Sequence, residues 1–239
     1  NEIEALKRTF HIIGRTTWDR AITNQINSRA EYHFCNETLR GEFYKHQWSI
    51  NNCEKHSIFL SQGQYSIKGL HYVLEAMSIV LKEFPGTKIH IAGKDITKDD
   101  TFRDRLIMTY YGKHIRKLID EYDLGGNVFF TGPLNEKQMC QEYLKAHVCI
   151  CPSSIENSPN SLGEAMLLGV PSIASYVGGI PDMMKHEKEG FLYQHDAPYM
   201  LAYYICKIFE DEDTALKISK KAREHALNTH DFDINVNKL

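Results

Sequence analysis

Two glutamates, Glu156 and Glu164, lie on either side of an expected helix start, for which Ser158 is a suitable cap and Pro159 a suitable first residue. The first main-chain amides of such a helix bind anions, and the helix dipole strengthens that binding. Here these would be the amides of Asn160, Ser161 and Leu162. Because carboxylates accept hydrogen bonds from hydroxyls, the segment suits a phosphorylated sugar. The alternative is a capped helix with two surface acids.

Glycines mark two further segments that could approach a ligand. Gly63 and Lys68 lie in a loop before another expected helix, where a lysine and main-chain amides can hold a phosphate. Gly178 and Gly179 let the backbone come close to a ligand. The simpler interpretations are a solvated helix start for the first segment and a tight turn for the second.

Other motifs of catalysis or metal binding are absent from the sequence. It contains no Walker loop, no G-x-G-x-x-G fingerprint, no H-E-x-x-H zinc motif and no nucleophile elbow. The six cysteines match neither a zinc ribbon nor a C-x-x-C pair. Cys149 and Cys151 would face the same side of one strand. We expect six reduced thiols, with a metal or redox site as the alternative.

The elements that position these residues alternate from about residue 57. Short apolar runs predict strands at 57–61, 88–93, 127–132, 147–152 and 170–175. Three- and four-residue spacing predicts a helix at about 70–84, and an apolar stripe predicts one at about 213–228. Helix-compatible stretches lie at about 102–123, 135–145, 159–168 and 197–210. This order indicates a doubly wound, Rossmann-like α/β fold with a parallel sheet of roughly six strands. Ligands bind such sheets beyond the carboxyl ends of the strands, where the three segments above would lie.

Residues 1–56 do not follow that alternation and show no long periodic segment. We expect them to lie outside the sheet, either packed on the other domain or as a remnant of an absent one, and residues 57–239 to form the ligand-binding domain. Because 28 Lys and Arg face 31 Asp and Glu, for a net charge of −3, no positive excess favours nucleic acid. Mean hydropathy is −0.41, and the apolar runs are far shorter than a bilayer span. The charged first residues are unlike a signal peptide, so we expect a cytoplasmic location.

Taken together, these motifs resemble the family-four retaining glycosyltransferases, also called glycosyl transferases group 1, which have the two-lobed GT-B fold. The E-x7-E pattern of that family matches Glu156 and Glu164. Further matches fall in family order at 68–69, 91–93, 165–171, 178–181 and 189–192, so that the resemblance covers about 57–230. The stretches 14–20 and 37–44 resemble the end of the N-terminal lobe and the crossover in some bacterial members.

The resemblance implies that this domain is the C-terminal lobe, which binds a nucleotide-sugar donor. Glu164 would hold the ribose hydroxyls and Glu156 those of the transferred sugar. Lys68 and the amides at Ser161 and Leu162 would hold the diphosphate and stabilise the leaving group, which makes Glu156 and Lys68 the expected catalytic residues. The other expected donor contacts are Asn160, Gly63, Gly178 and Gly179. Neither a metal nor a cofactor is expected.

One departure from the family concerns the diphosphate. Many members carry an arginine five residues before the lysine, and Gly63 occupies that place here. Arg103, Arg105 and Lys94 are candidate replacements.

The leading prediction is the donor-binding part of a bacterial transferase for cell-envelope polysaccharide, inactive as this fragment alone. The acceptor would be a glycan or a lipid-linked molecule. Peripheral association with the membrane, through the N-terminal lobe, is a further option. The alternatives are a nucleotide-sugar-binding module without activity and a sugar-nucleotide epimerase, against which the E-x7-E pattern speaks.

Overall fold

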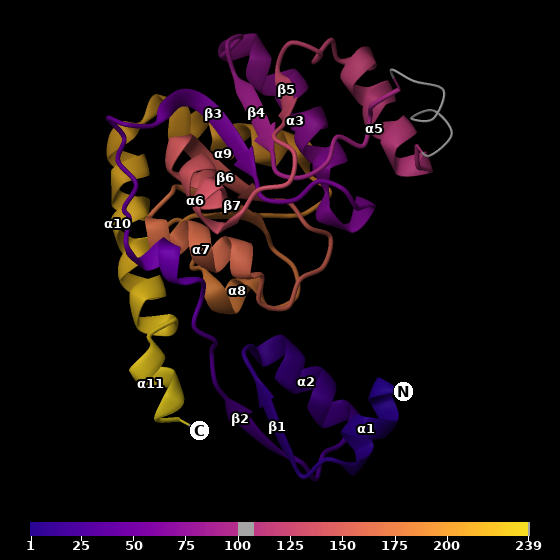
Figure 1. Ribbon diagram of the computed structural model, residues 1–239, viewed down its shortest axis with the longest axis vertical. Helices are drawn as coiled ribbons and strands as arrows, with labels where there is room; N and C mark the ends of the chain where they lie inside the picture. The colour runs from indigo at the N-terminus through magenta and orange to yellow at the C-terminus, as the bar shows by residue number, and fades with distance from the viewer. Residues whose placement is uncertain (100–107, 239) are drawn as a thin grey trace.

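Six parallel strands form the main sheet of the computed structural model, which describes residues 1–99 and 108–238 (Figure 1). Their order is β5-β4-β3-β6-β7-β8, so the strand order reverses between β3 and β6. This is the order of a Rossmann-like doubly wound fold, and it confirms the predicted α/β class. The strands are β3 (Glu54–Leu60), β4 (Lys88–Ile91), β5 (Val128–Phe130), β6 (Ala146–Cys151), β7 (Ser172–Ser175) and β8 (Phe191–Tyr193).

Helices cover both faces of this sheet (Figure 1). On one face α3 (Leu70–Glu83) packs against α5 (Tyr110–Glu121) and α9 (Pro198–Glu210). The other face carries α6 (Glu136–Lys145) and α7 (Asn160–Leu168), against which α10 (Glu212–Thr229) packs; α8 (Ile180–Met183) follows β7. The helix predicted over 102–123 begins only at residue 110 in the described chain, and its predicted part at 102–107 lies outside the described residues.

Burial accounts for the apolar runs that predicted the strands. All six residues of β6 and all four of β7 are buried, because helices lie on both sides of them. The predicted apolar stripe of α3 faces the sheet and α9, and most of it is fully buried. Those residues are Leu70, Val73, Leu74, Met77 and Val80.

The first 35 residues form a small unit that the periodicity of the sequence did not reveal. In it α1 (Glu2–Arg8), β1 (His11–Gly14), α2 (Thr17–Ile26) and β2 (Glu31–Phe34) alternate, and the two strands pair in parallel. Both strands have four residues, and no residue of either is buried. Strands this short and this exposed carry no apolar run, which is why the sequence pattern missed them.

A crossover segment links this unit to the main domain. It contains the short 3-10 helix η1 (Gly41–Tyr44), and its residues Phe43 and Trp48 are buried in the core of the main domain. β3 begins at Glu54, so 54–56 belong to the sheet, although 1–56 was expected to lie outside it. The apolar run starts later than the strand because the first two residues of β3 are exposed.

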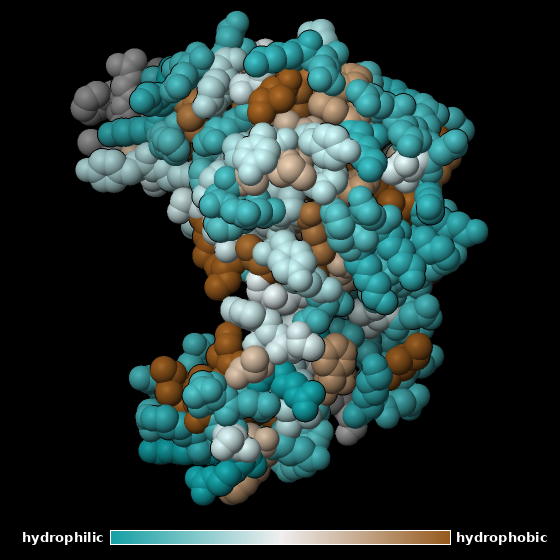
Figure 2. All heavy atoms as spheres, turned by 180° about the vertical axis from the view of Figure 1, so that it is seen from behind, coloured by the Kyte–Doolittle hydropathy of each residue, from teal (hydrophilic) through white to brown (hydrophobic). Residues whose placement is uncertain are grey.

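The C-terminal end of the chain returns toward the small unit. α10 runs along the main domain and is followed by α11 (Phe232–Val236), where the main-chain oxygen of Asn235 lies 3.4 Å from the Cys35 sulfur. Seen from behind, the molecule is hollowed between the main domain and the small unit, with hydrophobic side chains on the walls of the hollow (Figure 2). Within the described ranges, no helix combines the length and apolar character needed to cross a bilayer.

Candidate active site at the carboxyl end of the sheet

The loops that follow β3 and β6 are joined at the point where the strand order reverses. The Ser154 amide donates to the Ile67 carbonyl at 2.9 Å. Gly69 has a φ of +73°, and a Cβ atom there would lie 2.0 Å from the carbonyl oxygen of Pro152. A side chain would therefore force the two loops apart, so glycine is required at position 69 for both its conformation and its close approach.

This junction brings Lys68 and Glu156 together, a contact that the sequence analysis did not predict although it placed both segments at this edge of the sheet. The Lys68 ammonium donates to Oε1 of Glu156, and the Ser153 hydroxyl donates to the same oxygen at 2.9 Å. The Lys68 side chain is 27% exposed and that of Glu156 only 14%. The pair thus places one cation and one carboxylate, both reachable from solvent, beyond the ends of the two central strands.

Gly178 and Gly179 pack against the main chain of Glu156. Gly178 has a φ of +51°, and a Cβ atom on it would lie 1.8 Å from the Glu156 carbonyl oxygen. The Gly179 amide donates to that same oxygen at 3.0 Å. In this structure both glycines therefore fix the backbone that carries Glu156, by close approach of one loop to another.

The start of α7 differs from the sequence expectation by one residue. Pro159, with an extended backbone, is the cap, and Asn160 is the first helical residue, so Ser158 does not cap the helix. The Leu162 amide, expected to be free, donates to the Pro159 carbonyl at 3.0 Å, which tightens the first turn. The amides of Asn160 and Ser161 precede the first helical hydrogen bond and are the ones placed to meet an anion.

Glu164, one turn further along α7, is engaged by an arginine from the crossover. Arg40 donates from Nε to Oε1 of Glu164 at 2.6 Å and from Nη2 to Oε2 at 2.8 Å. The hydrogen bond with Glu164 raises the pKa of Arg40. The Glu164 side chain is 5% exposed, whereas that of Arg40 is 41% exposed. The sequence analysis assigned no role to Arg40, because 124 positions separate it from Glu164.

Arg40 and Glu164 line a cavity of about 370 Å³ together with Asn160 and Ser161. Its walls come from the crossover, the end of β3, α6 and the start of α7. The Tyr143 hydroxyl, from α6, donates to the Ser161 carbonyl at 3.0 Å and holds the start of α7 in place. The lining residues are Thr38, Leu39, Arg40, Ser61, Gln62, Met139, Tyr143, Asn160, Ser161 and Glu164.

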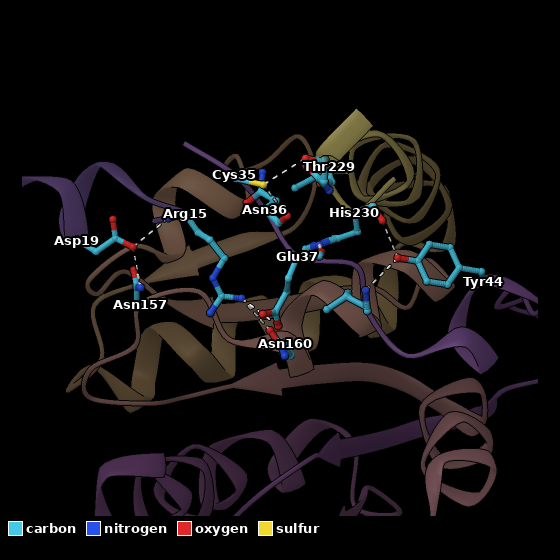
Figure 3. Close-up of polar contacts among 12 residues, drawn as sticks. Arg15, Asp19, Cys35, Asn36, Glu37, Tyr44, Asn157, Asn160, Thr229 and His230 are labelled. Carbon is cyan, nitrogen blue, oxygen red and sulfur yellow. Dashed lines mark hydrogen bonds and ion pairs between the residues drawn. The ribbon is translucent and has the colours of Figure 1, made fainter. Parts of the chain in front are cut away.

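The small N-terminal unit contacts Asn157, in the loop between β6 and α7, and Asn160, at the start of α7 (Figure 3). Arg15 extends from the end of β1 and donates to Oδ1 of Asn160 at 3.2 Å, while its guanidinium lies 3.1 Å from the Glu37 carboxylate. Asn157 donates to Asp19 at 2.8 Å. The loop between β6 and α7 is thus held by both parts of the chain.

The position of the missing family arginine has no room for a side chain. A Cβ atom on Gly63 would lie 2.8 Å from Cγ2 of Ile91 and 3.1 Å from Cδ2 of Leu70. Among the predicted replacements, Lys94 lines a different cavity, of about 490 Å³, together with Gln64. Arg103 and Arg105 lie outside the described residues.

One group of side chains in the part of the chain that the structure describes has metal-ligand spacing. It comprises His11, Glu31 and His33, whose ligand atoms lie within 4.8 Å of one another. These side chains belong to the β1–β2 pair of the small unit and do not line the cavity at Glu164. All six cysteines are free thiols, and burial raises the pKa of Cys151 to about 12, which keeps it protonated.

Comparison with known proteins assigns the chain to a family. Residues 42–225 match the family described as glycosyl transferases group 1. The poly(ribitol-phosphate) alpha-N-acetylglucosaminyltransferase of Staphylococcus aureus is 26% identical over 164 residues, which are 68% of this chain and 30% of that protein. The chain spans less than half the length of the curated relatives that it matches.

Solved structures share the fold at low identity. A mutant of S. aureus TarM, solved with fondaparinux, alpha-GlcNAc-glycerol and UDP, has a TM-score of 0.81 at 18% identity, covering 99% of this chain and 44% of that one. HepE of Anabaena, solved with UDP-glucose, has a TM-score of 0.76 at 19% identity, covering 99% and 64%. The chain therefore belongs to the glycosyl transferases group 1 family and has the fold of the GT-B glycosyltransferases.

Proposed function

We propose that this chain is the donor-binding part of a retaining glycosyltransferase that takes a sugar from a nucleoside-diphosphate sugar. The diphosphate binds at the amides of Asn160 and Ser161 and at Lys68, the ribose hydroxyls donate to Glu164, and the hydroxyls of the transferred sugar donate to Glu156. Lys68 then neutralises charge that develops on the departing diphosphate, which is the electrostatic step that such a site contributes to catalysis.

The observation that carries this proposal is the meeting of three features at one edge of the sheet. A helix start with open amides, two carboxylates and two cations all lie where the strand order reverses, which is where open α/β sheets bind ligands. A diphosphate ester of ribose presents both negative charge and vicinal hydroxyls, so it can use the cations and the carboxylates at once.

The donor nucleotide, the acceptor and the cellular location of the reaction are also part of this proposal. The S. aureus relative is named for poly(ribitol phosphate), and TarM and HepE were solved with UDP or UDP-glucose. These names support a uridine diphosphate sugar as the first donor to test and a glycan, in cell-envelope polysaccharide synthesis, as acceptor. We place the reaction in the bacterial cytoplasm, independent of metal, with acceptor binding supplied by an N-terminal lobe.

Binding can be tested directly with the 239-residue chain. UDP, GDP, ADP and dTDP are screened by thermal shift, and the best of them is measured by calorimetry. A ligand at 100 times its dissociation constant raises the unfolding free energy by about 2.7 kcal/mol, which is easily seen as a higher melting temperature. If none of the four shifts the melting temperature at millimolar concentration, the proposed donor site is wrong.

Transfer needs a second assay, on a chain that includes the N-terminal lobe. A donor labelled in the sugar distinguishes the alternatives by product: label on an acceptor indicates transfer, label in an epimeric sugar nucleotide indicates an epimerase, and unchanged donor indicates a binding module. The proposal predicts label on an acceptor.

A further inference from the structure

The diphosphate site proposed above has only one assigned cation. A diphosphate carries about two or more negative charges, and position 63, which holds a second cation in many family members, has no space for a side chain. A second positive charge must therefore come from another part of the chain if the diphosphate is to be matched.

Arg40 is placed in the same cavity as the open amides. Its neighbours along the cavity wall include Asn160 and Ser161, which begin α7, and Glu164, which lies three to four residues further on. That separation is about one helical turn, or about 5.4 Å along the axis. An arginine side chain that is 41% exposed can span this distance by a change of rotamer.

The pair between Arg40 and Glu164 cannot persist once a ribose binds at Glu164. Nε and Nη2 of Arg40 occupy one oxygen each, and only 5% of the Glu164 side chain is exposed. Vicinal hydroxyls that donate to this carboxylate must therefore replace the guanidinium. The displaced arginine would then lie beside a helix start that has just gained a diphosphate.

We propose that Arg40 is the second diphosphate-binding cation, held by Glu164 in this structure and transferred to the phosphates when the ribose takes its place. This inference rests on the proposed function, since it assumes a nucleoside diphosphate in the cavity. The centroid of the Phe43 ring lies 4.7 Å from the guanidinium carbon of Arg40, so the ring supports the side chain through a cation–π contact in this structure.

The exchange also gives every ionised side chain of the site an oppositely charged partner. Lys68 neutralises Glu156 and Arg40 neutralises Glu164, so both carboxylates are paired before the ligand arrives. A nucleoside-diphosphate sugar supplies hydroxyls for the two acids and phosphates for the two cations. Every charge therefore keeps a partner during binding, and no buried carboxylate is left alone.

The test separates phosphate contacts from nucleoside contacts. Calorimetry gives the dissociation constants of the parent nucleoside and of the diphosphate chosen by the screen. The first constant divided by the second measures how much affinity the phosphates add. Arg40→Met should lower this ratio about ten-fold, or about 1.4 kcal/mol. The nucleoside alone should bind at least as tightly as to the unmodified chain, because it no longer has to displace the arginine.

Three further variants keep the result interpretable if Arg40→Met folds poorly. Arg40→Met with Glu164→Gln removes both charges of the pair, and it should show the same lowered ratio. Glu164→Gln alone leaves Arg40 free, so its ratio should be kept or raised. Lys55→Met removes one positive charge from an ion pair with Glu212 at the other end of the sheet and should leave the ratio unchanged.

Two results would overturn the inference. The first is an unchanged ratio in both variants that lack Arg40, which would make the arginine a structural partner of Glu164 only. The second is a ratio that falls in Arg15→Met and not in Arg40→Met, which would assign the cation to the arginine held at Asn160. If the unmodified chain binds none of the four diphosphates, the proposed function fails first and this inference with it.

Discussion

The two ends of the central strands use polar residues in opposite ways. At the carboxyl end, ionised groups lie in pairs: Lys68 with Glu156 on the loops after β3 and β6, and Arg40 of the crossover with Glu164 of α7, where they line a cavity. At the amino end, β6 carries His147, whose ring is fully buried. The centroid of this ring lies 4.9 Å from that of Phe209, on which it is stacked.

The comparison assigns ligand binding to the carboxyl end of the strands and a contribution to stability to their amino end. Burial lowers the pKa of His147 to about 4, so its ring is neutral and acts as a packed side chain. At the carboxyl end the charges stay, because each has a partner that a ligand can replace. Substitutions at the carboxyl end should therefore change ligand affinity, while those at the amino end should change stability and its dependence on pH.

The largest expected effect comes from the junction of the loops. Gly69→Ala adds a Cβ atom 2.0 Å from the Pro152 carbonyl oxygen at a φ of +73°. Strain from the left-handed conformation and from the clash should lower the free energy of unfolding by about 3 kcal/mol and should weaken nucleotide binding as well. Urea denaturation measures the first effect. Gly126→Ala, where a Cβ atom meets nothing within 4 Å, is the matched control.

The second-largest effect is expected at the amino end, where the ionisation of His147 should make the free energy of unfolding depend on pH. The folded-state pKa of His147 lies below its ordinary value of 6.5, so the unfolded chain takes up the proton first as the pH falls. The stability from the neutral ring is complete above pH 6.5, falls by about 1.4 kcal/mol per unit below it, and is lost near pH 4.

Urea denaturation between pH 6.5 and 5 should therefore show about 2 kcal/mol more loss in the unmodified chain than in His147→Gln. Parallel curves for His147→Gln and the unmodified chain would show that this ring is not held neutral by burial.

A smaller effect is expected for Lys68. Lys68→Ala should weaken nucleoside diphosphate binding by about 1.5 kcal/mol, within the range for hydrogen bonds to charged groups, with little change in stability because Glu156 keeps its bond from Ser153. Lys55→Ala at the amino end should leave calorimetric affinity unchanged. Equal affinity for the Lys68 variant and the unmodified chain would mean that the diphosphate is held without this lysine.

Local patterns in the sequence predicted much of this arrangement. The alternation of apolar runs predicted the parallel sheet, and the strand ends predicted that the segments with Lys68 and Glu156 would lie at its carboxyl edge. These inferences worked because each rests on residues close in sequence to a strand end. The start of α7 was placed one residue early, since Ser158 and Pro159 fit a cap and a first turn by type alone.

Local sequence patterns could not predict contacts between residues that lie far apart in the sequence. Arg40 reaches Glu164 only because the crossover is anchored in the core through Phe43 and Trp48, which no local pattern reveals. The small N-terminal unit was missed for a related reason. Its strands are held by pairing with each other and by contacts such as that of Arg15 with Asn160, and not by apolar burial of their own.

The most direct test of the central claim concerns Glu164 and the ribose. Calorimetry with the parent nucleoside and its 2′,3′-dideoxy analogue gives a preference for ribose that does not depend on phosphate contacts. Glu164→Gln keeps the shape of the side chain and removes its charge, and a charge-assisted hydrogen bond is roughly twice as strong as a neutral one. We predict a preference of at least several-fold in the unmodified chain and nearly equal binding of the two compounds in Glu164→Gln. A variant that still prefers ribose as strongly as the unmodified chain would contradict the assignment of Glu164 as the ribose ligand.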